Sequence, residues 1–278
     1  MRSPQPRKQF AQHWLRSEKA LNKIVKSALL SPSDCLLEIG PGTGILTTQL
    51  LSVARSVVAV EIDRDLSQNL VKRFGNRDNF LLLEGDILTL DIDGQLQGFP
   101  KFQNPNKVVA NIPYNITGPI VEQLLGTISE PNPHPYQLIV LLVQKEVAQR
   151  ITANAGSKTF GALSVRVQYL ANCEYICDVP AKAFYPAPKV DSAVLRLSPR
   201  AIAHPATNPQ YLETLLKLGF SSKRKMLRNN LQSVISRDQL TQLLEQLEIN
   251  PQVRAEDLSV EQWVNLTNLM EITDLVTD

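Results

Sequence analysis

The chain has 278 residues, of which 43% are hydrophobic and 20% are charged, and its net charge is +2. This composition is typical of an ordinary globular protein with one large domain, or with one large and one small domain. It excludes a membrane-spanning protein, because no run of about 18 uncharged apolar residues occurs. The N-terminus lacks the basic and then apolar segments of a signal peptide, so we expect a cytoplasmic protein.

The cysteines do not indicate a disulfide framework or a metal site. Cys35, Cys173 and Cys177 are odd in number and too few for a set of disulfides. No histidine or second cysteine pair lies near them to complete a zinc site. We therefore expect reduced, buried thiols and no bound metal.

The first part of the chain alternates strand and helix patterns. A helix is expected over residues 17–29, with Ser17 as its N-cap and with Leu21 and Ile24 on its apolar face. Strands are expected at about 35–39, 56–61, 80–84, 107–110 and 137–143, with helical patterns such as 45–54 between most of them. This alternation predicts a parallel sheet with helices on both faces. Segments 163–170, 173–178 and 192–197 are strand-like without intervening helices, so we expect them to pair antiparallel at one edge.

The last part of the chain reads as helical. Prolines 199, 205 and 209 punctuate a polar stretch that we interpret as a linker. Helical patterns follow at about 210–219, 222–235, 236–247 and 259–272. The sequence therefore predicts a doubly wound, mostly parallel α/β domain over residues 1–200 and a small all-helical domain over residues 201–278.

A glycine-rich turn follows the first predicted strand. Residues 36–46 read Leu-Leu-Glu-Ile-Gly-Pro-Gly-Thr-Gly-Ile-Leu, and glycines 40, 42 and 44 allow a sharp turn and close approach of the backbone to a ligand. The spacing G-x-G-x-G differs from the dinucleotide fingerprint, and no Gly-Lys-Ser/Thr follows as in a P-loop. The loop therefore indicates a nucleotide-type cofactor without identifying it.

Acidic residues end the next two strands. Glu61 lies 21 residues after Gly40, which is where a doubly wound fold places the acid that binds ribose hydroxyls. Asp86 follows the strand at 80–84 within Gly-Asp-Ile and could accept a hydrogen bond from an adenine amino group. Each acid alone is more often a solvated strand end, but the glycine turn and both acids together favour a nucleoside site.

The turn Asn111-Ile112-Pro113-Tyr114 follows the apolar run 108–110. The exocyclic amine of adenine is a poor nucleophile, because its lone pair is delocalised into the ring. The side-chain oxygen of Asn111 and a backbone carbonyl could accept its two N–H groups and direct the lone pair outward. Pro113 fixes the backbone angle, and Tyr114 offers a face for base stacking. The alternative is an ordinary strand-to-helix turn, where Asn and Pro are common.

Basic residues concentrate in two segments. Residues 1–26 carry seven Lys or Arg against one acid, and residues 210–238 carry six against two. This distribution favours contact with a polyanion on one side of the protein. In the predicted helix 222–235, three basic residues flank the apolar face, namely Lys223, Lys225 and Arg228. Arg224 falls on the apolar side, where it could instead be an ion-pair partner within the protein.

These motifs resemble the ordered motifs of class I S-adenosyl-methionine-dependent methyltransferases, whose sheet is seven-stranded. More closely, the chain resembles the bacterial small-subunit ribosomal RNA adenine dimethyltransferases, the family of the kasugamycin-sensitivity enzyme. Further matches are Gln144-Lys145-Glu146-Val147, the run Phe184-Tyr185-Pro186-Ala187-Pro188-Lys189-Val190-Asp191-Ser192, and Lys223-Arg224-Lys225. The likeness extends from about residue 7 to about residue 270.

The resemblance implies S-adenosyl-methionine as cofactor and a role for each site residue. His13 and Leu15 would cover the cofactor, Gly40 its amino-acid end, Glu61 its ribose and Asp86 its adenine. Asn111 would bridge the cofactor and the target amine, while Tyr114 and Phe184 would sandwich the target base. Lys223, Lys225 and Arg228 would bind rRNA. The N-terminal motif departs from the family at Gln9, Ala11 and Trp14, which puts the geometry of an N-terminal lid in doubt.

The implied activity is dimethylation of N6 of two adjacent adenosines near the 3′ end of 16S rRNA, with a role in small-subunit biogenesis. The implied partner is small-subunit rRNA or the pre-30S particle, and we expect a monomer without a membrane or metal partner. Two alternatives stay open at this point. One is a large-subunit rRNA adenine methyltransferase of the macrolide-resistance type, and the other is a ribosome-assembly factor that acts mainly by binding.

Overall fold

The structure is a computed structural model, and it describes residues 5–7, 10, 12–201 and 203–277, without the side chains from residue 273 onward. The chain forms two compact units. The sheet unit contains the residues up to Leu124, Pro133–Ala148 and Cys173–Pro199; the helical unit contains Leu125–Asn132, Gln149–Asn172 and the residues from Arg200 onward. The chain passes for the last time from the sheet unit to the helical unit between Pro199 and Arg200.

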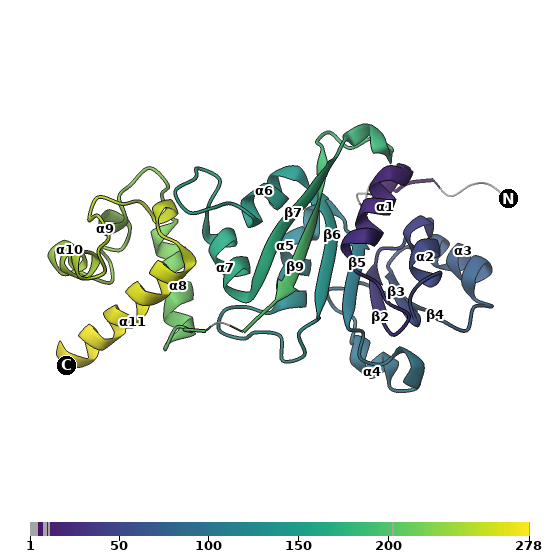
Figure 1. Cartoon of the computed structure of the whole chain (residues 1–278), viewed down its shortest axis with the longest axis horizontal. Helices are drawn as coiled ribbons and strands as arrows, with labels where there is room; N and C mark the ends of the chain where they lie inside the picture. The colour runs from purple at the N-terminus through teal and green to yellow at the C-terminus, as the bar shows by residue number, and fades with distance from the viewer. Residues whose placement is uncertain (1–4, 8–9, 11, 202, 278) are drawn as a thin grey trace. The chain divides into compact units, whose positions relative to one another are not determined.

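A seven-stranded sheet forms the centre of the sheet unit in the described part of the chain. Its order is β4-β3-β2-β5-β6-β9-β7, and the first five strands are parallel, whereas β9 runs antiparallel to β6. Figure 1 shows the strands side by side in this order. The bounds are β2 Cys35–Ile39, β3 Ser56–Glu61, β4 Phe80–Glu84, β5 Lys107–Asn111, β6 Leu138–Gln144, β7 Ala171–Val179 and β9 Ser192–Pro199. The predicted fold class, a doubly wound and mostly parallel seven-stranded sheet, is confirmed.

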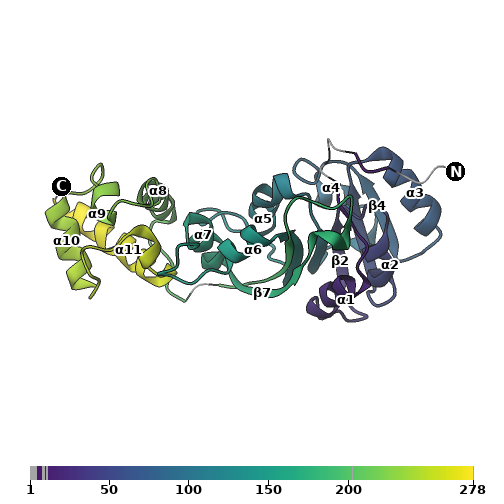
Figure 2. The same ribbon diagram turned by 90° about the horizontal axis from the view of Figure 1, so that it is seen from above.

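Helices cover both faces of this sheet, and α1 and α5 lie on opposite sides of it in Figure 2. The helices are α1 Glu18–Ser27, α2 Ile45–Leu51, α3 Arg64–Phe74, α4 Ile92–Leu96, α5 Thr117–Leu125 and α6 Lys145–Ile151. Helix α1 begins as predicted, because the Ser17 hydroxyl accepts the Ala20 N–H at 3.3 Å. Its apolar face joins a core cluster with α2, α3 and one face of the sheet. Every residue of β6 from Leu138 to Val143 is buried, as expected for a central strand.

A second, two-stranded sheet lies outside the large one. Strand β1 (Trp14–Leu15) pairs antiparallel with β8 (Phe184–Tyr185), so that Trp14 lies opposite Tyr185 and Leu15 opposite Phe184. This pairing attaches the N-terminal segment to the run 184–192, which the sequence marks as a distinctive motif.

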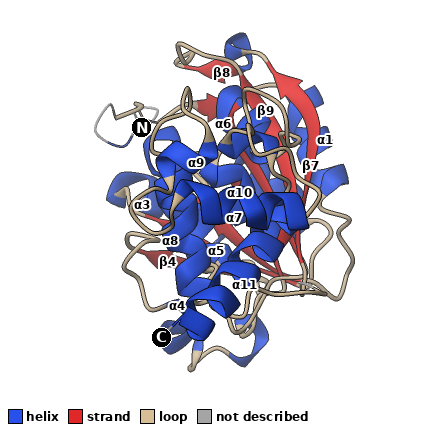
Figure 3. Ribbon diagram, turned by 90° about the vertical axis from the view of Figure 1, so that its left-hand side faces the viewer, coloured by secondary structure: helices blue, strands red, loops and turns tan. Residues whose placement is uncertain are grey.

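The helical unit has its own core around the buried Trp263, whose indole N–H donates to the Ala255 carbonyl at 3.3 Å. Its last four helices are α8 Pro209–Gly219, α9 Leu227–Asn230, α10 Arg237–Gln246 and α11 Val260–Thr277. Figure 3 shows them joined by loops, and the described residues 203–277 contain no strand. Three of the four helices predicted here are confirmed.

The predicted helix 222–235 is wrong. Residues 223–225 form a turn, only 227–230 are helical, and further turns follow. The side-chain amide of Asn230 donates to the carbonyls of Gly219 and Ser222, and the Leu227 N–H donates to Val253 at 2.8 Å. These bonds replace the hydrogen bonds that a longer helix would need.

The predicted strand 163–170 is also wrong, because these residues lie in α7 (Ala162–Leu170). The Ser164 hydroxyl accepts the Gly161 N–H at 3.0 Å and donates to the Arg150 carbonyl, which fixes the first turn of the helix. Val165 and Tyr169, four residues apart, both belong to the core of the helical unit. Tertiary packing has overridden the β-branched pattern of this segment.

Candidate functional site

The site lies at the carboxyl edge of the sheet, where the strand order reverses. Strands β2 and β5 are parallel neighbours, and the chain continues from β2 to β3 and β4 on one side and from β5 to β6 on the other. Open α/β sheets bind ligands at such a switch point, outside the carboxyl ends of the strands. Gly40 follows β2 directly, and Asn111 ends β5, so the two motifs meet there.

The glycine loop adopts a backbone that other residues rarely take. Gly40, Gly42 and Gly44 have φ angles of +65°, +59° and +78°, in the left-handed region where a Cβ atom is unfavourable. The Gly42 N–H donates to the Glu61 carboxylate at 3.0 Å. The other carboxylate oxygen of Glu61 accepts the Asp63 N–H, also at 3.0 Å. Glu61 is thereby fixed beside the loop, and burial raises its pKa above the usual range.

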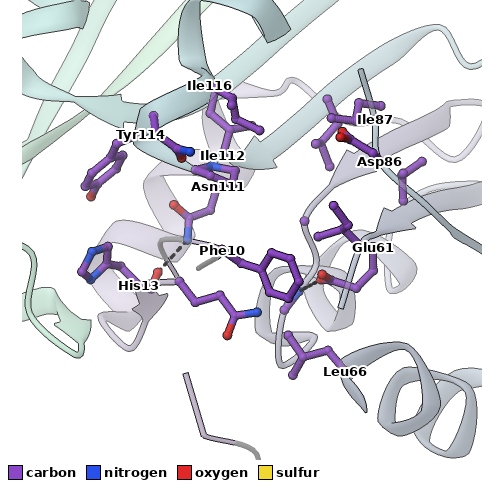
Figure 4. A pocket seen from close by; sticks show the side chains of 18 of the residues that line it. Phe10, His13, Glu61, Leu66, Asp86, Ile87, Asn111, Ile112, Tyr114 and Ile116 are labelled. Atoms are coloured by element: carbon purple, nitrogen blue, oxygen red, sulfur yellow. Dashed lines mark hydrogen bonds between the residues drawn. The ribbon is translucent and has the colours of Figure 1, made fainter. Parts of the chain in front are cut away.

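A cavity of about 340 Å³ opens at this edge, and Figure 4 shows its lining side chains. Residues far apart in the sequence meet here. Among the residues to which the sequence analysis assigns a cofactor or target-base role, those that line the cavity are His13, Gly40, Glu61, Asp86, Asn111 and Tyr114. Leu15 lines a smaller neighbouring hollow, which shares Trp14, Gly40, Gly42 and Asn111 with the main cavity. The structure therefore brings the predicted residues of both kinds, for cofactor and for target amine, to one place.

Around Glu61 and Asp86 the cavity combines polar and apolar groups. One carboxylate oxygen of Asp86 accepts the Leu88 N–H at 3.0 Å. Ile62, Leu66 and Ile87 also line the cavity. Apolar side chains beside two carboxylates suit a flat base with an attached ribose.

The turn after β5 presents its amide and its ring to the cavity. The Asn111 side-chain N–H donates to the His13 carbonyl at 3.2 Å, which directs the amide oxygen the other way. The Tyr114 hydroxyl is hydrogen-bonded to the Ser192 hydroxyl, and the Tyr114 ring stacks on His13 with centroids 5.7 Å apart and planes 19° apart. Burial raises the pKa of Tyr114, so the phenol stays protonated near neutral pH.

The N-terminal segment is tied across the cavity. Gln12 donates to Asp63 at 3.0 Å, and Arg7 forms ion pairs with Asp63 and Asp65. The His13 ring nitrogen Nδ1 lies 2.8 Å from the Pro186 carbonyl oxygen. Of the departures from the family motif, Gln9 and Ala11 lie outside the described residues, whereas Trp14 lines both hollows.

The predicted aromatic sandwich of Tyr114 and Phe184 is wrong. Phe184 is only 4% exposed, belongs to the core cluster and is not among the residues that line the cavity. Successive side chains of a strand point to opposite faces, so in β8 Phe184 points into the core, and Tyr185, at 43% exposure, points outward. The ring that stacks on Tyr114 is His13.

One residue of the site was not identified from the sequence. Glu38, at the end of β2, lines the smaller hollow and is 1% exposed. Neither of its carboxylate oxygens has a hydrogen-bond partner among the described residues. Burial, with a further contribution from the charge of Glu61, raises its pKa to about 8. The signal that could have identified it is an acid two residues before Gly40, in an otherwise apolar strand.

The basic residues expected to bind RNA lie in the helical unit, in the turn 223–225 and in α9. Lys223 and Lys225 are exposed, and Arg228 is half-buried. Arg224 is exposed and has no ion pair within the described part of the chain. The alternative that Arg224 is an internal ion-pair partner is therefore not supported, and Arg224 lies in the same exposed turn as Lys223 and Lys225.

Within the described residues, no helix is long and apolar enough to cross a membrane. All three cysteines are free thiols, but only Cys35 is buried, so the prediction of buried thiols is wrong for Cys173 and Cys177.

Comparison with known proteins gives a consistent result. The family model of ribosomal RNA adenine dimethylases matches residues 4–271. The chain is 68% identical over 267 residues to the ribosomal RNA small subunit methyltransferase A of Trichormus variabilis, across 96% of this chain and 98% of that protein. It is 57% identical over 273 residues to the protein of the same name from Synechocystis, across 95% and 96% of the two chains.

Two solved structures share the fold and part of the sequence. A dimethyladenosine transferase from Plasmodium falciparum has a TM-score of 0.77 at 28% identity, covering 94% of this chain and 98% of that one. The 23S rRNA methyltransferase ErmE has a TM-score of 0.71 at 27% identity, covering 93% and 99%. The chain is thus similar over nearly its whole length to enzymes that methylate ribosomal RNA or adenosine.

Proposed function

The chain belongs to the ribosomal RNA adenine dimethylase family, and from this premise we propose that it dimethylates N6 of two adjacent adenosines near the 3′ end of small-subunit rRNA, using S-adenosyl-methionine. One observation carries the proposal. A single cavity joins the glycine loop, Glu61 and Asp86 to the Asn-Ile-Pro-Tyr turn. The protein is therefore a methyltransferase whose cofactor and target groups would meet at Asn111.

The residues of the cavity fit S-adenosyl-methionine. Each oxygen of the Glu61 carboxylate accepts one backbone N–H and keeps a lone pair for a ribose hydroxyl. Asp86 can accept a hydrogen bond from the adenine amine, and Ile62 and Ile87 supply apolar lining for the base. Glu38, buried without a partner among the described residues, is suited to receive the cationic amino group beside Gly40. When bound, the cofactor supplies an electrophilic methyl group on a sulfonium.

The chain contributes positioning and dipoles to the chemistry. Because its N–H is held by the His13 carbonyl, Asn111 directs its side-chain oxygen toward the target amine. Accepting an N–H there localises the nitrogen lone pair for in-line displacement. The amine becomes acidic only once it is alkylated, so a carbonyl or a water molecule suffices to take the proton. A second methylation requires the monomethylated amine to rotate and bind again.

The relatives favour the small-subunit substrate. The proteins named small subunit methyltransferase A are 57% to 68% identical to the chain, whereas the large-subunit enzyme ErmE is 27% identical. The three basic residues of the helical unit, Lys223, Lys225 and Arg228, supply a place for rRNA backbone. We place this helical unit as the docking domain and the sheet unit as the catalytic domain of a cytoplasmic monomer that acts during small-subunit biogenesis.

The test is methyl transfer to a choice of substrates. The protein is incubated with labelled S-adenosyl-methionine and, separately, with small and large ribosomal subunits that lack their adenine methylation. We expect label on adenosines near the 3′ end of the small-subunit rRNA. Label confined to large-subunit rRNA would contradict the proposal, and so would binding to small subunits without transfer.

A further inference from the structure

The first helix carries a basic face beside the catalytic cavity. Lys19, Lys23 and Lys26 are exposed, and their spacing places them on one face of α1. The opposite face is buried through Ala20, Leu21 and Ile24. The acid of this helix is Glu18, in its first turn, so the exposed face is positively charged.

The two-stranded sheet extends this charge to an aromatic ring. The Arg16 backbone N–H donates to the Ala183 carbonyl at 2.7 Å, which fixes the start of α1 beside β8. The Arg16 guanidinium lies 4.1 Å above the centroid of the Tyr185 ring, and Tyr185 is 43% exposed. Lys182 and Lys189, on either side of β8, are also exposed. The nearby Asp191 accepts the Ala181 N–H and so has a structural partner.

This surface begins at the rim of the cavity. Trp14, which lines the cavity, is the strand partner of Tyr185. His13, which lines the cavity as well, is held at 2.8 Å by the carbonyl of Pro186, the residue after Tyr185. An RNA strand that leaves the cavity past His13 would therefore meet Tyr185 first and the lysines next.

We propose that this β1–β8 surface, made of Arg16, Lys19, Lys23, Lys182, Tyr185 and Lys189, binds the RNA strand that flanks the target adenosine. The proposal rests on the proposed function. A base that undergoes chemistry must leave its stack, so the backbone on either side of it has to be held in an extended form. Lysines satisfy the phosphates, and an exposed ring stacked on a guanidinium can take one unpaired base.

The test uses pairs of substitutions in the full-length protein. Lys19→Ala/Lys23→Ala and Lys182→Ala/Lys189→Ala each remove two charges, and Tyr185→Ala removes the ring. The matched control is Arg55→Ala/Arg77→Ala, because both arginines are exposed and precede β3 and β4, at the amino edge of the sheet opposite the cavity. KM for small subunits and its dependence on salt are measured for each variant, together with Kd for S-adenosyl-methionine.

Each lysine pair should lower the slope of log KM against log salt by about 1.4, since a single-stranded phosphate contact contributes about 0.7. Tyr185→Ala should raise KM about fivefold or more. Cofactor affinity and the control should match the wild type. An unchanged slope would overturn the inference, even where KM rises, because it would point to a protein contact. If the wild type itself fails to methylate small subunits, this result refutes the proposed function. An unchanged slope in the variants of an active wild type refutes only the proposed RNA-binding surface.

Discussion

The glycine loop allows a matched pair of substitutions that separates backbone strain from packing. Gly40 and Gly44 have similar φ angles, +65° and +78°. An added Cβ at Gly40 would approach only the Asn111 carbonyl oxygen, at 3.8 Å, whereas at Gly44 it would lie 2.6 Å from the Phe74 ring and 3.0 Å from Leu70. Both neighbours are buried, and Phe74 is further held by Phe80, at 5.3 Å between ring centroids.

The left-handed backbone costs alanine about 1–2 kcal/mol at either position. Overpacking adds about 1–3 kcal/mol, and we expect this second cost only at Gly44. Gly44→Ala should therefore be less stable than Gly40→Ala by about 1–3 kcal/mol. Hydrogen exchange of the slowest amides in β2 and β3 measures this difference within the sheet unit.

Cofactor binding should show the opposite order. Gly40→Ala places a methyl group beside Asn111 at the rim of the cavity, so it should weaken cofactor binding more than Gly44→Ala does. Equal stability losses in the two variants would refute the packing argument, because they would mean that Phe74 and Leu70 move aside at no cost.

Three further predictions concern single groups of the site. Burial raises the pKa of Glu38 from its ordinary 4.5 to about 8 in the folded protein. Its contribution to stability is therefore complete below pH 4.5 and is lost as the pH rises toward 8. Across this window the free energy of unfolding of Glu38→Gln, measured with urea, should rise relative to that of the wild type by about 1.4 kcal/mol per pH unit. Ser192→Ala and Tyr114→Phe should each slow methyl transfer while leaving cofactor affinity unchanged, and the double variant should be no slower than either single one, because both remove the same hydrogen bond; additive losses would show that the two hydroxyls act separately. Lys223, Lys225 and Arg228 of the helical unit can be replaced together by Glu. This change should raise KM for small subunits and reduce its salt dependence by about one unit of slope per lost phosphate contact, with cofactor affinity unchanged. An unchanged slope would mean that these residues have a structural role.

The sequence predicts the strands of the sheet because they are continuous apolar runs that end in motifs. Strand β6, for example, has no polar residue between Leu138 and Val143, and a parallel sheet buried on both faces requires such a run. The same reasoning places Gly40, Glu61, Asp86 and Asn111 together, since parallel strands bring their carboxyl ends to one edge.

The wrong predictions for segment 163–170 and for Phe184 both depend on contacts with residues far away in the sequence. Segment 163–170 has the composition of a strand, but Ser164 is bonded to Arg150 and Val165 packs in the helical core. Phe184 and Tyr185 are adjacent aromatics, and which one faces the core depends on the register of β8 with β1. No pattern in residues 184–192 alone specifies this register, because the partner strand lies far earlier in the chain: Leu15 pairs with Phe184, 169 residues later.

The proposed reaction transfers two methyl groups to the amine of adenine at the Asn-Ile-Pro-Tyr turn. It is tested most directly by digesting the rRNA of treated small subunits to nucleosides and identifying the products by mass spectrometry, with Asn111→Ala as the matched variant. We expect N6,N6-dimethyladenosine with the wild type and a rate roughly 10²–10³-fold lower with Asn111→Ala, by analogy with the loss of one positioned dipole. Methylation at another position of the base, or near wild-type turnover by Asn111→Ala, would contradict the proposed reaction.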